Sequence, residues 1–222
     1  MISLASSLVM ATLLAQATEA PPTATTPAGD QTLIRVDLED GFALHPWLYH
    51  ERRINDVLGL MVDVHGQTRG QNGRFPEFAE LDIGPNWHLG NLQVNPQLGV
   101  DLAWKSGVTG GHTKFADLLP QLYLLYNDGF INAESWNVLY LPFTKGAAKM
   151  FQARLLASLT LPGGVSVGPH GEATWIEDLG WDRKAVGGDV ALGGSFGQAI
   201  IFLADELTRD VLEIRITYLR AF

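Results

Sequence analysis

The stretch AELDIGPNWHLGNLQVNPQLGVDLAWK, residues 79–105, alternates apolar and polar side chains along two runs joined by Gly90-Asn91. Successive side chains of a strand point to opposite faces, so each run indicates a strand with one apolar and one polar face. The runs are 11 to 13 residues long, whereas a strand of a soluble protein has about 5–6. A strand that crosses a membrane needs about 9–11 residues. The stretch therefore predicts a hairpin of two membrane-crossing strands.

The same alternation continues to the C-terminus and predicts an all-β fold, a transmembrane up-and-down antiparallel β-barrel of about twelve strands. The expected strands cover residues 33–39, 42–50, 57–67, 77–89, 92–105, 115–127, 130–142, 150–161, 164–176, 185–196, 199–206 and 211–222. The first two are the weakest, because Pro46 interrupts the second and Arg52-Arg53 follows it. A barrel of ten strands is the alternative.

The connections between the expected strands alternate in length. Tight turns rich in turn-forming residues fall at Gly90-Asn91, Asp128-Gly129, Pro162-Gly163 and Gly197-Gln198. Longer loops fall at residues 68–76, 106–114, 143–149 and 177–184. Short turns at one end and long loops at the other are typical of outer-membrane barrels, whose short turns face the periplasm. The layout therefore predicts a barrel of this kind with a periplasmic C-terminus.

Composition excludes several other classes of protein. The chain has 222 residues, a net charge of −9 and no cysteine. No apolar run reaches the 18 or so residues that a membrane helix needs. The acidic balance argues against a nucleic-acid partner, because phosphate contact requires clustered positive charge. The lack of cysteine excludes disulfides, thiolate chemistry and lipid anchoring on cysteine.

The N-terminal residues 1–20 have the features of a secretory signal peptide. Residues 2–14 form a short apolar stretch, and small-x-small cleavage patterns follow at Ala15-Gln16-Ala17 and Thr18-Glu19-Ala20. The stretch departs from the usual pattern because no Lys or Arg precedes it. Residues 21–31 are rich in Pro, Thr and Ala and predict a flexible linker. The barrel is then expected to cover residues 32–222.

Aromatic residues are expected to cluster at the two ends of the outward face. Amphipathic rings prefer the headgroup level of a membrane, so two such bands favour a lipid-embedded barrel over a soluble one. The expected membrane-interface aromatics are Trp87, Tyr126, Phe196 and Phe222 at the periplasmic end, and Trp104, Phe151 and Trp175 at the extracellular end. Only Trp136 falls clearly in the middle of a strand.

The last eleven residues, LEIRITYLRAF (212–222), alternate hydrophobic side chains and end in Phe222. This strand resembles the C-terminal signal of Gram-negative outer-membrane β-barrel proteins, and only Arg220 departs from the pattern. The resemblance implies an outer-membrane location and contact with outer-membrane lipid and lipopolysaccharide. It also implies that the barrel-assembly machinery recognises this strand.

The inward face is expected to be strongly acidic. The alternation points twelve acids inward: Asp37, Glu39, Asp63, Glu80, Asp82, Asp101, Asp117, Glu134, Glu172, Asp189, Asp205 and Glu213. It points four bases inward: Arg35, Lys105, Arg154 and Arg215. Buried charges must be paired or hydrated, so an excess of carboxylates predicts a wet lumen.

The leading functional prediction is a narrow porin-like channel that favours cations or neutral polar solutes. The residues expected to line it and set its selectivity are Asp82, Asp101, Asp117, Glu80, Lys105, Glu134, Arg154 and Glu172. Asp117 begins its strand, so it is expected nearer the extracellular mouth than the other aspartates. The oligomeric state is left open.

Two alternatives accompany the channel. The first is a closed barrel whose inward charges form a stabilising network, serving as a structural or interaction protein of the envelope. The second is a lipid-modifying hydrolase that uses Ser166, His170 and Glu172, which share one face of a strand. Ser166 and His170 are about 13 Å apart on such a strand, too far for a nucleophile–base contact. No catalytic residue is therefore assigned. No metal or other cofactor is expected either, because the six histidines lack ligand spacing.

Overall fold

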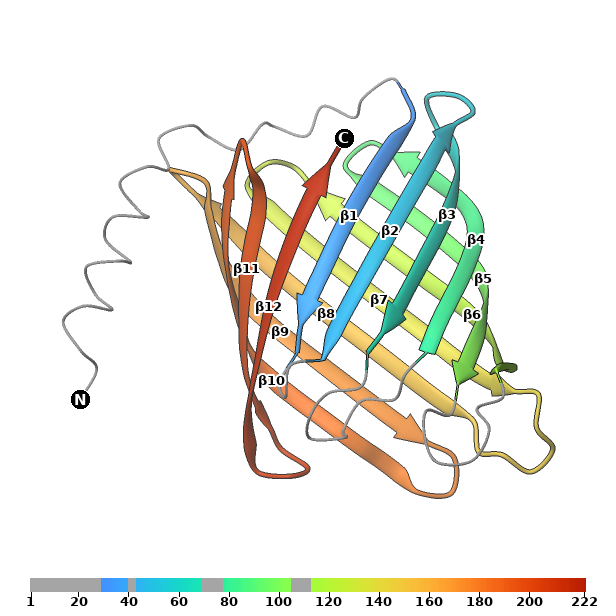
Figure 1. Cartoon of the computed structure of the whole chain (residues 1–222). Coiled ribbons are helices and arrows are strands. Elements are labelled where there is room, and N and C mark those ends of the chain that lie inside the picture. Colours follow the sequence, from blue (N-terminus) through green and yellow to red (C-terminus); the bar gives the residue numbers. More distant parts are fainter. Residues whose placement is uncertain (1–28, 40–42, 69–77, 105–112) are drawn as a thin grey trace.

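The computed structural model describes residues 29–39, 43–68, 78–104 and 113–222, which form a closed barrel of twelve antiparallel strands (Figure 1). The strands are β1 (Gln31–Leu38), β2 (Leu44–Arg53), β3 (Leu58–Gln67), β4 (Phe78–Leu89), β5 (Leu92–Trp104), β6 (Thr113–Asn127), β7 (Ile131–Pro142), β8 (Met150–Leu161), β9 (Val165–Ile176), β10 (Gly180–Gly194), β11 (Gly197–Glu206) and β12 (Val211–Ala221). The predicted fold class and the count of twelve are confirmed, and ten is wrong. The expected signal peptide and most of the linker lie outside the described residues.

Each strand pairs with its neighbours in sequence, and β1 pairs with β12 to close the barrel. At this closure Leu33 lies opposite Ala221. Thr32 and Phe222 exchange two backbone hydrogen bonds of 3.3 and 2.8 Å. Closure leaves no sheet edge without a partner, which a barrel in lipid requires. Among the described residues, no helix is long and apolar enough to cross a membrane.

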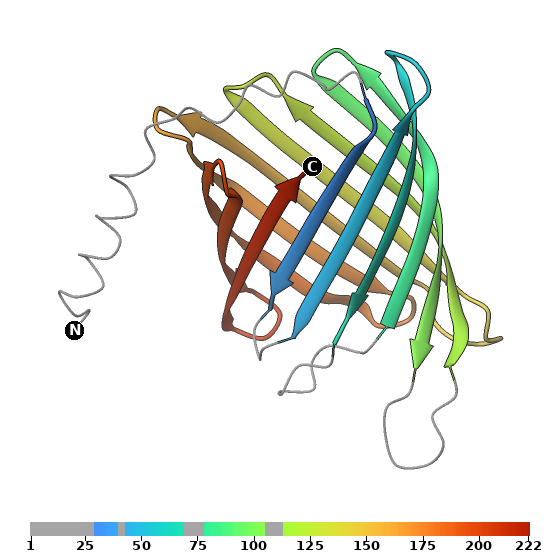
Figure 2. The same cartoon turned by 45° about the horizontal axis from the view of Figure 1, so that its top comes forward.

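The two ends of the barrel differ, as Figure 2 shows. We call one the turn end; it holds the connections 54–57, 90–91, 128–130, 162–164 and 195–196, with Gln31 and Ala221. The other, the loop end, holds Leu38, Leu44, Gln67, Phe78, Trp104 and Thr113 at the ends of their strands, with the connections 143–149, 177–179 and 207–210. The expected tight turns at 90–91, 128–129 and 162–163 are therefore all at one end.

The β6–β7 turn shows how the turn end is built. The Asp128 carboxylate accepts hydrogen bonds from the backbone N–H groups of Ile131 (2.7 Å) and Phe130 (2.9 Å). These bonds favour the ionised carboxyl and lower the pKa of Asp128. Gly129 supplies the positive φ of 90° that the turn requires.

Two connections differ from the expectation. β10 begins at Gly180, so the loop expected over 177–184 shrinks to three residues, with Asp178 at φ 69° and Gly180 at φ 80°. The β10–β11 turn falls at 195–196, earlier than the expected Gly197-Gln198. The faces of β11 are the reverse of those expected, because its even-numbered residues pair with the inward odd-numbered residues of β10, as Phe202 does with Asp189. Asp205 is exposed on the outside, a correction to its expected lumenal place, and its neighbour Glu206 is fully buried.

The barrel is polar inside and apolar outside, the reverse of a soluble barrel. Along β4, Glu80 and Asp82 are buried, whereas Leu81 and Ile83 between them are about half exposed. The buried apolar cluster is small and comprises Ala185, Phe202 and Ala204. Exposed apolar side chains on consecutive strands form the outer band that a lipid-embedded barrel needs.

Candidate functional site

The candidate site is the barrel lumen, which the inward side chains of all twelve strands line. A cavity of about 530 Å³ occupies its turn-end half. Gln31, Asn91 and Asn132 lie at its mouth, and Arg35, Arg154 and His170 lie at its inner limit. The wall between them is mixed, with amides, hydroxyls and apolar side chains. This half of the lumen therefore presents hydrogen-bonding groups along its length.

A layer that we call the waist lies at the inner limit of the cavity. It consists of Arg35, Trp47, Trp136 and Arg154. Trp47 on β2 and Trp136 on β7 come from opposite walls, and their ring centroids are 6.1 Å apart in an edge-on contact. The Arg35 guanidinium lies 5.5 Å from the Trp47 ring, and that of Arg154 lies 5.6 Å from Trp136. The waist spans the lumen and narrows any path along it.

The cations of the waist are paired with carboxylates. Arg35 Nε lies 2.9 Å from Asp37 Oδ1. Arg154 Nη2 donates to Glu134 Oε1 at 2.5 Å, and the Tyr123 hydroxyl donates to the same oxygen at 2.9 Å. Because the charges are matched locally, the waist is held together electrostatically as well as by ring contacts.

A second network lies on the wall of β9, β10 and β12, with Glu172 at its centre. Glu172 accepts hydrogen bonds from Arg215 and from Arg183, each at 2.6 Å. Arg183 also donates to Glu213. His170 joins the network, with Nε2 3.0 Å from Glu172 and Nδ1 2.8 Å from Asp189. The carboxylates of this wall therefore face arginine and histidine side chains.

The wall of β3 to β6 is acidic. Asp101 lies opposite Glu80 on one side and opposite Asp117 on the other. Gln121 Nε2 donates to Glu80 Oε1 at 2.7 Å and to Asp82 Oδ1 at 2.5 Å. Gly99 makes room for this contact, because a Cβ there would collide with the Asp82 carboxylate.

The structure brings the predicted lumen residues into three groups. Glu80, Asp82, Asp101 and Asp117 lie together on the acidic wall, Glu134 and Arg154 pair at the waist, and Glu172 lies apart. Asp117 is paired with Asp101 in the β5–β6 register and does not lie beyond it toward the loop end as expected. Lys105 lies outside the described residues. A role of these residues in selectivity stays a prediction.

The predicted interface aromatics fall at both ends of the barrel. Trp87, Tyr126, Phe196 and Phe222 are exposed at the turn end. Phe151 and Trp175 lie opposite each other at the loop end, partly exposed and exposed respectively. The side chain of Trp104 lies outside the described residues. Contact of these rings with lipid headgroups stays a prediction.

Several important lumen residues were missed by the sequence analysis. Arg183 was assigned to a loop, and the contact between Trp47 and Trp136 depends on side chains five strands apart. Gln121 bridges two carboxylates, but no motif in the sequence marks it. Only the alternation of β6 indicates that its side chain points into the lumen.

The residues considered for a hydrolase do not contact one another as a triad. Ser166 Oγ lies 3.1 Å from Thr160 Oγ1. Both ring nitrogens of His170 face carboxylates, Asp189 and Glu172. A base that activates a serine must reach its hydroxyl, so Ser166 and His170 do not act as a nucleophile–base pair in this conformation.

No family model matches the sequence, and no curated protein matches it. Solved structures do match. One, described as "Unveiling the Mechanism Behind the in-meso Crystallization of Membrane Proteins", has a TM-score of 0.58 and 10% identity, over 86% of this chain and 84% of that one. The KdgM porin has a TM-score of 0.49 and 10% identity, over 86% and 98%. OmpT, an outer membrane protein of Vibrio cholerae, has a TM-score of 0.41 and 9% identity, over 87% and 96%.

At such low identity the likeness to the first of these structures concerns the fold alone. The closed topology, apolar exterior and polar lumen agree with it. The chain therefore has the fold of outer-membrane β-barrel proteins.

Proposed function

We propose that this chain is an outer-membrane barrel that passes small polar solutes and ions through its lumen, with the waist as the narrowest point. The observation that carries the proposal is the cavity of about 530 Å³, which is lined by polar and charged groups together with apolar side chains and extends from the turn end to the waist. The acidic wall beside the waist favours cations or neutral solutes over anions.

A closed barrel that serves as a structural or interaction protein of the envelope is the second candidate. The contact of Trp47 with Trp136 across the lumen favours it, as does the pairing of Arg35 and Arg154 with carboxylates. The two candidates differ in whether the waist lets solutes through. Conductance separates them directly.

Purified protein in planar bilayers is expected to give small conductance steps with a reversal potential that indicates cation preference. The double variant Trp47→Ala/Trp136→Ala removes the rings that narrow the waist, so its conductance is expected to be several-fold larger. Trp87→Ala is the matched control, because Trp87 is exposed on the outer face and its loss leaves the lumen unchanged.

The folded band on unboiled gels shows whether each variant retains its barrel. If neither the wild type nor the folded double variant conducts, the closed barrel is the better account. Anion preference in the wild type would contradict the proposed effect of the acidic wall.

The proposal places the mature protein in the outer membrane of a Gram-negative bacterium, in contact with lipid and lipopolysaccharide. The strand that ends in Phe222 is proposed as the segment that the barrel-assembly machinery recognises. The departure at Arg220 is compatible with this role, because its guanidinium lies 5.1 Å from the Phe222 ring. The side chain then stays at the end of the barrel.

We expect the protein to fractionate with outer membranes and to migrate faster on gels before boiling than after it. A closed barrel resists detergent until it is heated, because all of its strands are paired. Cell fractionation and gel migration with and without boiling check both points. Recovery in a soluble periplasmic extract would contradict the membrane location.

A further inference from the structure

Four potential metal ligands meet on the acidic wall, two from β3 and two from β4. Asp63 and His65 are two residues apart on β3, and Glu80 and Asp82 are two residues apart on β4, so each pair shares the inner face. The register places Asp63 opposite Asp82 and His65 opposite Glu80. All four side chains are at least 97% buried.

The ligand atoms of this group converge. One ligand atom each of Asp63, His65 and Asp82 lie within 4.8 Å of one another. His65 Nε2 is 3.1 Å from Glu80 Oε1 and 3.4 Å from Asp82 Oδ2. Two ligands of a tetrahedral zinc ion, each about 2.0–2.2 Å from the metal, lie roughly 3.3–3.6 Å apart. The spacing of His65 and Asp82 agrees with that value.

A second observation is independent of this spacing. Asp63 Oδ1, His65 Nε2, Glu80 Oε2 and Asp82 Oδ2 are all buried, and none makes a hydrogen bond of acceptable geometry to a described residue, although His65 Nε2 lies at ion-pair distance from Glu80 and Asp82. Gln121 binds the other oxygen of Asp82 and the other oxygen of Glu80, which leaves these two atoms available. Buried polar atoms are nearly always paired, so orphaned atoms on the three converging side chains of Asp63, His65 and Asp82 indicate a missing partner.

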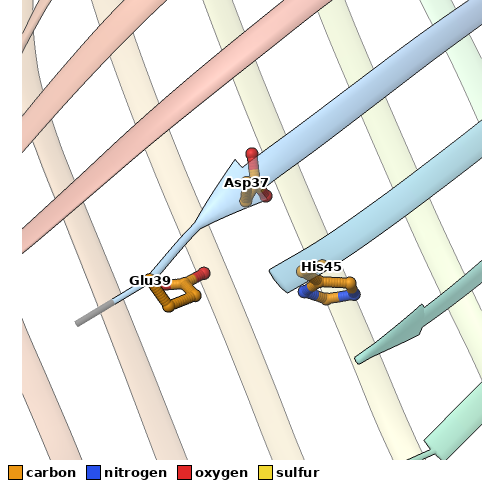
Figure 3. A group of neighbouring side chains, drawn as sticks. All are labelled: Asp37, Glu39 and His45. Atoms are coloured by element: carbon orange, nitrogen blue, oxygen red, sulfur yellow. The ribbon is translucent and has the colours of Figure 1, made fainter. Parts of the chain in front are cut away.

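The His65 ring is held in the orientation that metal binding requires. Its Nδ1 is hydrogen-bonded to His45 Nε2 at 3.0 Å, which turns Nε2 toward the carboxylates. The ring stacks on Trp47 at 3.8 Å with the planes 2° apart. His45 in turn lies near Asp37 and Glu39 at the end of β1 (Figure 3). A histidine ligand commonly has its second nitrogen fixed in this way by a neighbouring group.

We propose that Asp63, His65, Glu80 and Asp82 bind a divalent transition-metal ion of the Zn²⁺ type. One imidazole nitrogen and three carboxylate oxygens form a ligand set that Zn²⁺ accepts, and four ligands complete its usual coordination. Three carboxylates facing one imidazole leave a net negative charge in a buried place. A divalent cation offsets that charge more fully than a proton on His65 does.

The wild-type full chain, refolded in detergent micelles with Zn²⁺ and freed of unbound metal, is expected to retain one Zn²⁺ per chain. Metal content and Zn²⁺ titration measure this. Asp63→Asn and His65→Gln each remove one ligand, and each is expected to weaken Zn²⁺ binding about tenfold or more.

His170→Gln is the matched control. His170 is also buried between two carboxylates, but Asp189 faces Nδ1 and Glu172 faces Nε2, so the three groups do not share one ion. This variant is expected to bind Zn²⁺ as the wild type does. The folded band on unboiled gels verifies each barrel before titration.

The proposal fails if the wild type retains no Zn²⁺, or if folded Asp63→Asn or His65→Gln binds it as tightly as the wild type. If neither ligand variant folds, the visible absorption spectrum of Co²⁺ bound to the wild type tests the proposed site instead. The intense visible absorption of tetrahedral Co²⁺ supports the site. The weak absorption of octahedral Co²⁺ overturns it.

Discussion

Glu172→Gln is expected to lower the free energy of unfolding by about 3–5 kcal/mol, the usual effect of breaking a buried ion pair on one side. Glu172 accepts hydrogen bonds from Arg183 and Arg215 at 2.6 Å and lies 3.0 Å from His170. Gln keeps the shape of the side chain but not its charge. Arg215 then keeps the weaker contact with Glu39 at 3.7 Å. Urea titration of folding into lipid vesicles measures the loss.

Glu177→Gln is the matched control for this substitution. Glu177 is at the loop end, where its carboxylate lies 3.2 Å from Lys149 Nζ and accepts a hydrogen bond from the Lys149 backbone N–H. That backbone bond and the Lys149 side chain lower the pKa of Glu177. Exposed pairs contribute little because water screens them, so the urea midpoint is expected to stay within error. If Glu172→Gln and Glu177→Gln both changed the free energy of unfolding only slightly, water would be screening the ion pairs of Glu172 as it does those of Glu177.

The strands could be predicted because membrane barrels impose one rule on every strand. Each strand must present an apolar face to lipid and a polar face to the lumen, so the alternation in 79–105 gives both the strand and its orientation. The prediction fails for β11, where the inward face was assigned wrongly. Alternation gives the two faces of a strand, but pairing with the neighbouring strand decides which one is inward. Asp189 on β10 pairs with Phe202 on β11, so Asp205, expected inside, lies outside.

The contacts inside the lumen could not be predicted in the same way. Which side chains meet depends on the stagger between strands, and alternation gives only the face. Asp63 and Glu80 were both expected to point inward. Their meeting with His65 and Asp82 at metal-ligand spacing follows from the β3–β4 register. Predicting the waist would also require the positions of strands that are not neighbours, because Trp47 and Trp136 approach from opposite walls.

Leu98→Arg is expected to cost about 2–4 kcal/mol of folding free energy, the range for a charge placed at the bilayer midplane on the lipid face of a barrel. Leu98 lies near the middle of β5, opposite Ile83 and Pro120, and is 53% exposed. In a membrane this exposure is to hydrocarbon, where a guanidinium loses its hydration. Leu98→Ala, which introduces no charge, is expected to be much milder.

Gln97→Arg separates this effect from that of adding an arginine anywhere in β5. Gln97 is one residue away but is 6% exposed and faces the lumen, opposite Gln121. An arginine there gains carboxylate and amide neighbours, because Gln121 itself contacts Glu80 and Asp82. Its cost is therefore expected to be clearly smaller than that of Leu98→Arg in the same vesicles. A larger cost at Gln97 than at Leu98 would mean that the apolar face does not contact lipid, and that the barrel does not span a membrane.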